Sequence, residues 1–579
     1  MMFSLILLLA LAPDDEITPL VEGYCYPCHS SEKARGDVDL ETLLIAEDAP
    51  AGFEQWAKVA RVLTEQRMPP ERRAQPTDEE RGRLISWIEG RLAAVAAERP
   101  GRTLVRRLSR REYTHSVRDL LGVSLPDSIE FPADGSGGEG FDNNADTLFV
   151  PPLLMERYLE AAGTIADEAP LASVSRDDAH AWIRELARRA YRWPDIDEDA
   201  ARLIALYDSK AESSHLGALR LVTRAVLVSP RFLFRIEHEG LDADAPELAS
   251  RLSYFLWCTT PDEELMSLAA SGALRRRDVL DSQVDRLIAD PRLMDFADDF
   301  SLQWLGLTSL RTTTRPNGRM FPSYTDSLRE SMIAEAAALF AAVMRGEGTL
   351  LDLIDSEFAY VNEELAAHYG LSGVSGEGLR RVVLPDKRRG GVLGLGAVQT
   401  VTSYSRRTSP VLRGKWVLET MLGSGTPPPP SNAKSLPEDD RPKEGQTFRQ
   451  RLEEHRKNPE CASCHQRMDP LGFGLENFDA IGRWRDEIGG IPIDATGTLE
   501  DGQSFEGPIA LKRILMEKRE VFCQVLTRRL IGYARGRGVE AHEEPLVRAI
   551  ASRVAEQGYS GPSLLRGIAQ TFLPESSSE

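Results

Sequence analysis

The sequence predicts a mainly α-helical, multidomain protein in which two Cys-x-x-Cys-His modules flank a series of helical domains. Apolar residues recur at helical spacing through most of the chain, and a small β-hairpin region is expected only near the C-terminus. At 579 residues the chain is too long for one hydrophobic core, so several domains are expected. No fixed-period repeat runs through it.

Changes in composition and pattern divide the chain into segments. We expect a signal-like leader at 1–12, a first Cys-x-x-Cys-His module at 14–98, helical domains at 100–170, 171–240 and 241–375, a second such module at 385–500, and a C-terminal helical domain at 501–575. The second module includes a stiff, exposed, proline-rich linker at 424–446.

The first module is predicted to end in an amphipathic helix. Thr77 and Glu80 form a capping box, in which each side chain bonds the backbone of the other residue. After them, Leu84, Ile88 and Leu92 recur on one face of a helix, so this face should lie in the core.

The next domain is predicted to hold two helices separated by a loop rich in glycine and carboxylates. Val117, Leu120 and Leu121 mark the first helix, and a helical pattern at 151–169 marks the second. The loop lies between them at 131–144.

Helices also dominate the central part of the chain. Two are expected within 176–240, and the stretch at 247–369 is strongly helical. Within it, a helix is predicted to start at Thr260. Thr260 would be the cap, Pro261 the first residue of the helix and Glu263 the acid at its third position.

The C-terminal part begins with a helical pattern at 448–455. Residues 486–508 are rich in Gly, Asp, Ile and Thr and predict short hairpins. Residues 510–573 return to a helical pattern.

One motif occurs near each end of the chain, as Cys-Tyr-Pro-Cys-His at 25–29 and Cys-Ala-Ser-Cys-His at 461–465. This is the attachment motif of c-type haem: two thiols form thioethers with the vinyl groups, and the adjacent histidine is placed to ligate the iron. We therefore predict two covalently attached haems, held by Cys25, Cys28 and His29 and by Cys461, Cys464 and His465.

Two other interpretations of the cysteine pairs are weaker. A shared zinc site would have to close the very long loop between residues 28 and 461, and would leave both histidines unexplained. A thioredoxin-like dithiol does not require the histidine, and no βαβ pattern surrounds either motif.

Met68 is the predicted sixth ligand of the first haem. It lies well after His29, is followed by Pro69 and Pro70, and is the only methionine in its module. Methionine ligation raises the reduction potential and suits electron transfer over oxygen chemistry. The alternative is that Met68 fills core space.

The sixth ligand of the second haem is left open by the sequence. Met468 follows His465 too closely to reach the opposite face of the same iron. His455, Met516 and His542 are the alternatives. If none of them binds, an open iron position permits peroxide or substrate chemistry, so catalysis would reside there.

The loop from Asp134 to Asp146 offers carboxylate, amide and hydroxyl oxygens on a glycine-rich turn, which are ligands that calcium prefers. The order of an EF-hand is absent, and turns of this composition are usually plain turns. Calcium at this loop is therefore a secondary prediction.

The N-terminal residues predict export. Residues 1–12 are almost wholly apolar, are too few to span a bilayer, and end in an Ala10-x-Ala12 pattern typical of signal cleavage. Export agrees with the haem motifs, because bacteria attach c-type haem outside the cytoplasmic membrane. We expect a periplasmic or cell-surface protein.

The net charge and the two remaining cysteines bear on the partners of the protein and on its disulfides. The net charge of −20 argues against nucleic acid as a partner, and no stretch is long enough for an integral membrane span. Cys258 and Cys523 lie in apolar patterns and are predicted to be small buried residues, with a disulfide between them left open.

Several motifs together resemble one family. They are Leu108 to Tyr113, Asp134 to Asn144, the motif at 461–465 with the run Asp469 to Asp479, and the motif at 25–29 with Met68 and its prolines. In these the chain is similar to the planctomycete multidomain cytochrome c proteins, over about residues 20–570. The resemblance implies haem binding, export and electron transfer, and it implies no substrate.

We therefore expect an exported dihaem c-type cytochrome that transfers electrons, with an unknown redox partner and an unknown oxidised substrate. One alternative is a peroxidase-like or other oxidoreductase with an open second haem. The other is a surface scaffold or polysaccharide-binding protein in which the haem is accessory.

Overall fold

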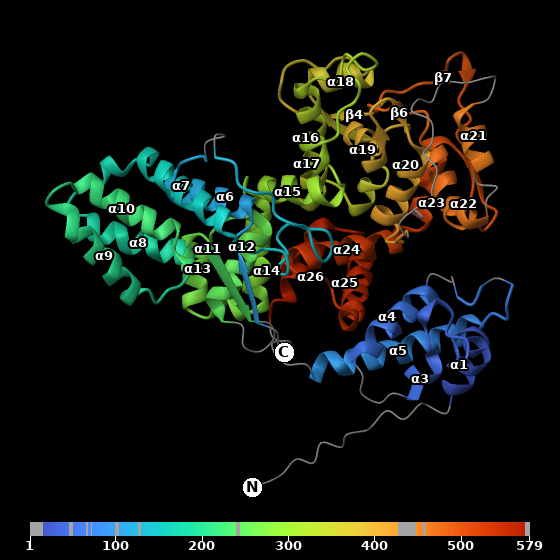
Figure 1. Cartoon of the computed structure of the whole chain (residues 1–579), viewed down its shortest axis with the longest axis horizontal. Coiled ribbons are helices and arrows are strands. Elements are labelled where there is room, and N and C mark those ends of the chain that lie inside the picture. The colour runs from blue at the N-terminus through green and yellow to red at the C-terminus, as the bar shows by residue number, and fades with distance from the viewer. Residues whose placement is uncertain are drawn as a thin grey trace, which may run out of the picture. The chain divides into compact units, whose positions relative to one another are not determined.

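The computed structural model describes residues 16–45, 50–64, 68–70, 72–98, 103–125, 129–238, 244–426, 447–455 and 459–573. The predicted leader at 1–12 and most of the predicted linker at 424–446 fall outside these ranges. The chain forms two compact units, Met1–Pro100 with Val539–Ala549, and Gly101–Gly538 with Ile550–Glu579. Helices prevail in both, and each sheet of the described residues has two strands, so the mainly α prediction is confirmed (Figure 1).

The first unit is a small helical domain. Its elements are α1 (Thr18–Tyr24), α2 (Tyr26–His29), η1 (Arg35–Asp37), α3 (Leu40–Ile45), α4 (Pro50–Thr64), α5 (Asp78–Glu98) and η8 (Ala541–Glu543). The predicted capping box starts α5, because the Thr77 amide donates to Glu80 Oε2 at 2.8 Å and the Glu80 amide donates to Thr77 Oγ1 at 3.2 Å. Leu84, Ile88 and Leu92 are buried in the core of this unit, as their spacing predicts.

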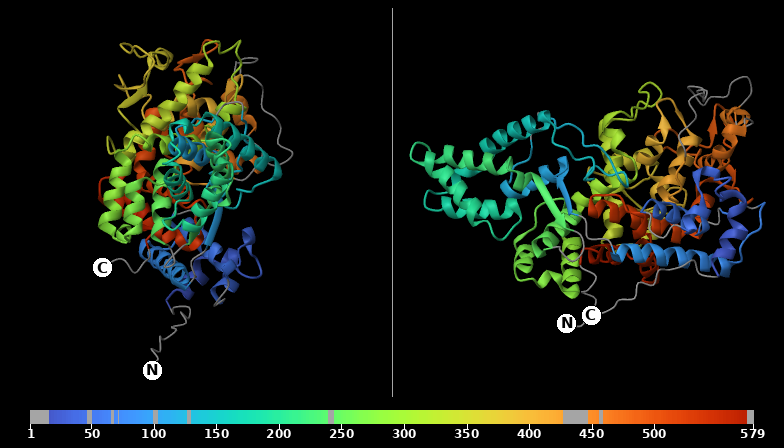
Figure 2. Two further views of the ribbon diagram at one scale, coloured as in Figure 1. Left: turned by 90° about the vertical axis from the view of Figure 1, so that its left-hand side faces the viewer. Right: turned by 60° about the horizontal axis from the view of Figure 1, so that its bottom comes forward.

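The second unit begins with a lobe of helices tied together by one pair of strands. Its elements are β1 (Thr103–Arg107), α6 (Arg110–Leu121), α7 (Pro152–Glu168), η2 (Leu171–Ser173), α8 (Ala179–Tyr191), α9 (Asp197–Ala211), α10 (His215–Leu227), α11 (Pro230–Leu233) and β2 (Phe234–His238). β1 and β2 are antiparallel, with Val105 opposite Ile236, and the two strands lie side by side in Figure 2.

The prediction of two helices within 176–240 is wrong. This range holds three long helices, a short fourth helix and strand β2. The break between α9 and α10 escaped the pattern because it is made by a cap: Ser214 Oγ accepts from the Gly217 amide at 3.1 Å and starts a new helix.

The middle of the second unit is helical, as predicted. Its elements are α12 (Ala245–Trp257), α13 (Glu263–Ala270), η4 (Ala273–Arg275), α14 (Arg277–Ala289), α15 (Leu293–Trp304), α16 (Thr308–Thr312), α17 (Asp326–Met344), η5 (Leu350–Leu353), β3 (Phe358–Val361), α18 (Glu363–Tyr369) and β4 (Arg380–Val383), with β3 antiparallel to β4. The helix start predicted at Thr260 is displaced to Asp262, which caps α13 by accepting from the Leu265 amide at 3.0 Å. Asp262 is the cap because its carboxylate accepts a hydrogen bond from the Leu265 amide in the first turn of the helix.

The C-terminal part of the second unit contains the predicted hairpins and helices. Its elements are η6 (Val392–Gly394), α19 (Gly396–Val401), β5 (Ser403–Tyr404), β6 (Arg407–Thr408), α20 (Pro410–Trp416), η7 (Val417–Met421), α21 (Phe448–His455), α22 (Pro459–Phe473), β7 (Glu487–Ile488), β8 (Ile491–Pro492), β9 (Thr496–Thr498), β10 (Ser504–Glu506), α23 (Gly507–Glu517), α24 (Arg519–Arg535), α25 (Glu544–Glu556) and α26 (Gly561–Gln570). The first residues of α25 belong to the first unit. β7 pairs with β8 and β9 with β10, which confirms the hairpins predicted at 486–508.

Helices α20 and α22 pack with their backbones in contact. A Cβ atom on Gly414 would lie 1.8 Å from the Met468 carbonyl oxygen, and one on Gly472 would lie 1.8 Å from the Pro410 carbonyl oxygen. Only glycine permits so close an approach. The pair of glycines therefore holds α22, which carries the second Cys-x-x-Cys-His motif, against α20 (Figure 1).

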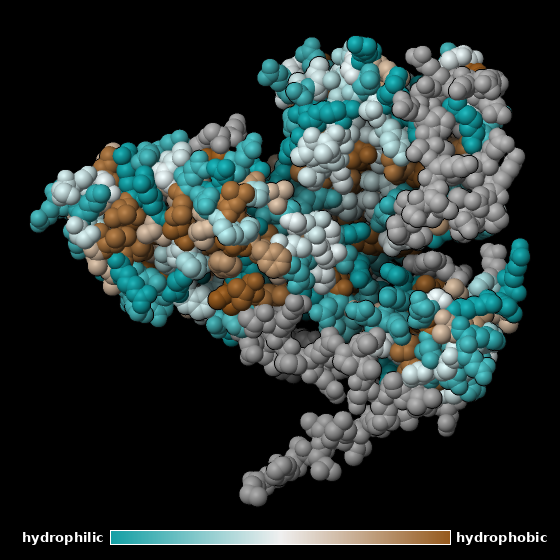
Figure 3. Space-filling model, in the orientation of Figure 1, coloured by the Kyte–Doolittle hydropathy of each residue, from teal (hydrophilic) through white to brown (hydrophobic). Residues whose placement is uncertain are grey.

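The surface is largely polar, in keeping with the net charge of −20. The space-filling view shows apolar side chains over the lobe that contains α6 to α10 (Figure 3). Exposed large apolar residues include Phe149, Leu153 and Leu159. Scattered exposure of this kind is normal in globular proteins. Among the described helices, none is both long enough and apolar enough to cross a membrane.

Candidate functional site

The first Cys-x-x-Cys-His motif forms a single helical turn at the junction of α1 and α2. The amides of Cys28 and His29 both donate to the Cys25 carbonyl, at 3.1 Å and 2.9 Å. Residues three and four apart on such a turn share one face. Both cysteines are half-buried free thiols, as thioether formation requires.

The ring of His29 is oriented by a backbone carbonyl. Its Nδ1 lies 3.3 Å from the Val38 carbonyl oxygen, which can only accept a hydrogen bond. This contact assigns the proton to Nδ1 and leaves the lone pair of Nε2 for a metal. The donor set of this turn therefore fits a c-type haem, for which His29 would supply a nitrogen ligand through Nε2.

Met68 lies on a segment that a buried arginine holds in place. Arg81 Nη1 donates to the Met68 carbonyl at 2.9 Å and to the Leu63 carbonyl at 3.2 Å. Gln75 Nε2 donates to the Pro69 carbonyl at 2.9 Å, which ties down the adjacent residue. Met68 is 38% exposed, so it does not fill core space and its thioether is accessible to a ligand.

The second motif lies within the single helix α22. Along that helix, Cys461 precedes Cys464 by three residues and His465 by four, so the spacing matches one turn of helix. Cys464 is a half-buried free thiol. This backbone arrangement also fits haem attachment.

The ring of His465 is oriented by a carboxylate of the same helix. Its Nδ1 lies 2.9 Å from Asp469 Oδ1, and the side chains of His465 and Asp469 are 15% and 0% exposed. As in the first motif, this contact assigns the proton to Nδ1 and leaves Nε2 for iron. Asp469 escaped the sequence analysis, although its spacing of four residues from His465 on a predicted haem helix was a usable signal.

The candidates for the sixth ligand of the second haem lie in different places. Met468 is buried, and its backbone contacts Gly414. Met516 is half-buried on α23. His542 belongs to the first unit, where its Nδ1 lies 3.4 Å from Glu540 Oε2. The side chain of His455 lies outside the part of the chain that can be described.

The glycine- and carboxylate-rich loop makes protein contacts with its acids. Asp134 pairs with Arg107, and Glu139 Oε1 accepts from Arg528 Nε at 3.1 Å. Burial raises the pKa of Asp142 to about 8, which favours its neutral form. Within the described ranges, no group of three or more His, Cys, Asp or Glu side chains is placed to hold a metal ion. Arginines therefore contact two of the acids of this loop, Asp134 and Glu139.

The same loop docks on the end of α24. Asn143 Nδ2 donates to the Tyr533 carbonyl at 2.8 Å, and the Ala145 amide donates to the Gly536 carbonyl at 2.8 Å. A Cβ on Gly138 would lie 2.6 Å from the amide nitrogen of Gly538. Glycine at position 138 therefore permits a close approach of two backbones.

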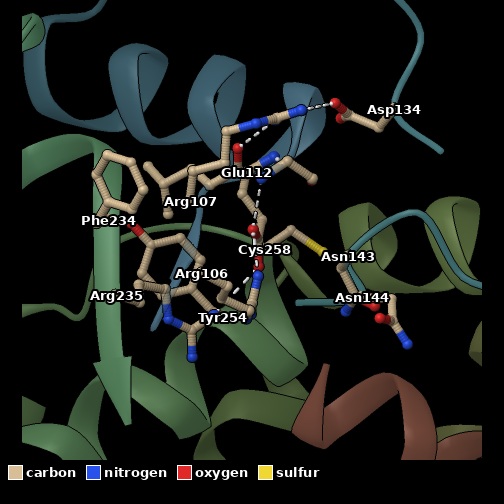
Figure 4. Close-up of polar contacts among 12 residues, drawn as sticks. Arg106, Arg107, Glu112, Asp134, Asn143, Asn144, Phe234, Arg235, Tyr254 and Cys258 are labelled. Carbon is tan, nitrogen blue, oxygen red and sulfur yellow. Dashed lines mark hydrogen bonds and ion pairs between the residues drawn. The ribbon is translucent and has the colours of Figure 1, made fainter. Parts of the chain in front are cut away.

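A network of buried charges lies beside this loop (Figure 4). Arg106 donates to both oxygens of Glu112 at 2.9 Å, and Arg235 Nη1 donates to Glu112 Oε1 at 3.1 Å. Burial alone would raise the pKa of Glu112, but the charges of Arg106 and Arg235 outweigh it and lower that pKa. Ser109 completes the arrangement, because Glu112 and Ser109 form a capping box at the start of α6.

This network explains the basic run before α6 in structural terms. The basic run before α6 forms strand β1, whose Arg106 is opposite Arg235 of β2. Glu112 and Glu237 both lie within ion-pair distance of these two arginines and together balance their charge, which a buried pair of like charges requires. The run is therefore structural, and nothing in it is placed for chemistry.

The two remaining cysteines are buried, as predicted. Cys258 is 1% exposed and its Sγ lies 3.3 Å from Tyr533 Oη, and Cys523 is also 1% exposed. Both are free thiols, so no disulfide joins them. Burial raises the pKa of Cys523 to about 11 and that of Cys258 well above its usual range. Neither has the character of a reactive thiol.

Family models match the chain in consecutive stretches. Residues 25–72 match a model described as planctomycete cytochrome C. Models described as proteins of unknown function match residues 106–170 (DUF1587), 178–237 (DUF1595), 244–371 (DUF1592), 389–488 (DUF1588) and 501–573 (DUF1585). The model at 389–488, which spans the second motif, carries the name PSCyt3. No curated protein and no solved structure matches the chain.

Proposed function

Because the chain belongs to the planctomycete multidomain cytochrome c proteins, we propose that it is an exported dihaem c-type cytochrome that carries out electron transfer. Membership in this family implies covalently bound haem c. The proposed attachment residues and iron ligands are Cys25, Cys28, His29, Met68, Cys461, Cys464 and His465. The proposed domain division is that of the sequence segments, with residues 539–549 added to the first module.

One observation carries the proposal. In both motifs the histidine Nδ1 has an acceptor, at 3.3 Å for His29 and 2.9 Å for His465, which supports the tautomer whose lone pair is on Nε2. Two thiols precede each histidine by one and four residues on one helical turn. Disulfide exchange would need neither ring to be oriented in this way. A zinc-binding histidine is oriented in the same way, so zinc is disfavoured by the long loop between the two motifs and not by the rings.

The residues of the chain have distinct roles in this proposal. Haem c, when bound, supplies a one-electron couple whose potential depends on its ligands. The cysteines would hold each haem through thioethers, and His29 and His465 would each supply a nitrogen ligand. Met68 would supply a thioether ligand to the first haem, and such a ligand favours the reduced form and suits an electron acceptor.

Expression of the full chain in a host with haem-attachment machinery tests the proposal. The mass and the visible spectrum should show two haems. Replacing Cys25 and Cys28 with Ser should remove one haem, and replacing Cys461 and Cys464 should remove the other. Cys523→Ala is the control and should keep both. A colourless wild-type protein, or one whose cysteine pairs hold zinc, contradicts the proposal.

A second candidate function follows from the burial of Met468. With the Met468 side chain buried, a second iron would depend on a more distant residue or keep an open position. An open position makes a peroxidase-like oxidoreductase the alternative. Binding of cyanide or carbon monoxide at the second haem, compared between wild type and the Met516→Ala variant, separates the two functions. Two filled irons bind neither ligand.

We also propose that the protein is periplasmic or displayed at the cell surface. The support is the apolar leader with its Ala10-x-Ala12 end and the compartment in which haem c is attached. N-terminal sequencing of the mature protein and its distribution between cell fractions test this proposal. A haem-free protein retained in the cytoplasm with an intact leader would contradict it.

A further inference from the structure

The two proximal histidines differ in what holds them. His29 Nδ1 faces a neutral backbone carbonyl, that of Val38, at 3.3 Å. His465 Nδ1 faces a carboxylate, that of Asp469, at the shorter distance of 2.9 Å. Haem potentials respond to the basicity of the axial ligand, so this difference has a chemical consequence.

The contact between His465 and Asp469 is built into the helix. The two residues are four apart on α22, where side chains lie one above the other. The next residue is Pro470, yet the helix continues to Phe473, so the turn that holds Asp469 is preserved. No rearrangement of distant segments is needed to bring the carboxylate to the ring.

The surroundings make the carboxylate effective. The Asp469 side chain is 0% exposed, so solvent does not screen it. The surrounding stretch of α22 packs closely on α20, since Gly414 meets the backbone of Met468 and Gly472 meets the backbone of Pro410. The carboxylate is therefore fixed relative to the ring, and a charge fixed in a poorly polarisable interior acts strongly.

A carboxylate on Nδ1 makes the imidazole a stronger electron donor through Nε2. Stronger donation favours the more positive ferric iron over ferrous iron. We propose that Asp469 is the positioning residue that fixes the tautomer of His465 and lowers the reduction potential of the second haem. This inference rests on the proposed dihaem function, and it assigns the carboxylate a role that the attachment motif itself does not contain.

The test measures the potential of the second haem alone. In the full-length chain with Cys25→Ser and Cys28→Ser, only the second haem is attached, so a spectroelectrochemical titration reports a single potential. Asp469→Asn keeps the size and an acceptor oxygen but removes the charge. We expect its potential to rise, with at least a tenfold change in the ferric–ferrous equilibrium, which equals about 59 mV for one electron.

Control variants separate charge from structure. Glu500→Gln is the control. The Glu500 carboxylate lies 3.7 Å from Arg467, a residue of α22, but the Glu500 side chain is 57% exposed. Solvent therefore screens its charge, and the substitution should leave the potential of the second haem unchanged. Asp469→Glu keeps the charge and should stay closer to wild type than Asp469→Asn does. If Asp469→Asn does not fold, Asp469→Ser serves the same comparison.

The outcomes are distinct. A raised potential in the neutral variants, with none in Glu500→Gln, supports the inference. An unchanged or lowered potential in a folded neutral variant overturns it, even if both haems are present. A wild-type chain that carries no second haem instead contradicts the proposed function, and is recognised from the mass before any potential is measured.

Discussion

Gly414 meets the backbone of Met468 so closely that a Cβ atom on Gly414 would lie 1.8 Å from the Met468 carbonyl oxygen. The contact joins α20 to the helix that carries the second haem motif. Because the obstacle is a backbone atom inside a helix, it cannot move aside as a flexible side chain would. The position of α22 against α20 therefore requires glycine, which has no Cβ, at residue 414.

We predict that Gly414→Ala destabilises the second unit by about 1–3 kcal/mol, as overpacking of a close contact does. Urea denaturation measures the free energy of unfolding. Gly163→Ala on α7 is the matched control, because a Cβ there has no heavy atom within 4 Å. It should stabilise by about 0.5–1 kcal/mol, as alanine does in a helix interior. Equal effects of the two substitutions would contradict the packing argument.

Met68→Ala should lower the reduction potential of the first haem, because a methionine ligand raises that potential. We expect a change of at least tenfold in the ferric–ferrous equilibrium, about 59 mV. The measurement uses a chain with Cys461→Ser and Cys464→Ser, so that the first haem is observed alone. Met294→Ala is the control, since Met294 is similarly exposed, at 37%, and lies on α15 of the second unit. An unchanged potential in Met68→Ala would show that another residue completes the iron.

Glu112→Ala should destabilise the second unit by about 3–5 kcal/mol, because it leaves the two buried arginines Arg106 and Arg235 to share the single carboxylate of Glu237. Thermal and urea unfolding both report this loss. Glu160→Ala removes a carboxylate that is 49% exposed and pairs with Arg157 at 2.6 Å. Exposed pairs of this kind contribute about 0–1 kcal/mol, so this control should remain near wild type.

Glu335 gives the second unit a dependence on pH. Burial raises the pKa of Glu335 to about 8, a rise that the hydrogen bond from Tyr369 Oη, at 2.6 Å, opposes. The folded state therefore holds this proton more tightly than the unfolded state, in which the pKa is 4.5. The contribution to stability is complete below pH 4.5 and is lost as the pH rises towards 8.

We expect Glu335→Gln to remove this loss. Between pH 5 and pH 8, the contribution of Glu335 makes the free energy of unfolding of wild type fall by up to about 1.4 kcal/mol per pH unit. The neutral variant should lack that slope. Glu330→Gln, on the same helix with a side chain that is 47% exposed, should keep the wild-type slope. If the free energy of unfolding depended on pH in the same way in wild type and in Glu335→Gln, Glu335 would not be a buried acid that is protonated in the folded state.

The sequence predicted helices and caps best where the signal is local. Thr77 and Glu80, the leucines of α5 and the hairpins at 486–508 are confirmed, because each depends on residues a few positions apart. The failures have the same origin. The Ser214 hydroxyl caps a new helix where the sequence pattern showed no break. Asp262, and not Thr260, caps α13, so that helix begins two residues later than predicted. Such choices depend on which polar atom reaches an amide, and composition does not reveal that.

The sequence alone determined the two Cys-x-x-Cys-His motifs, because their spacing is local. It also contained the spacing of four residues between His465 and Asp469, but the contact itself was recognised only in the structure. Tertiary structure decided the rest. The pairing of β1 with β2, the approach of Gly414 to Met468 and the enclosure of Asp469 join segments that are far apart in the chain. Such contacts form only when whole elements are packed, because burial and close backbone approach depend on the shape of both partners.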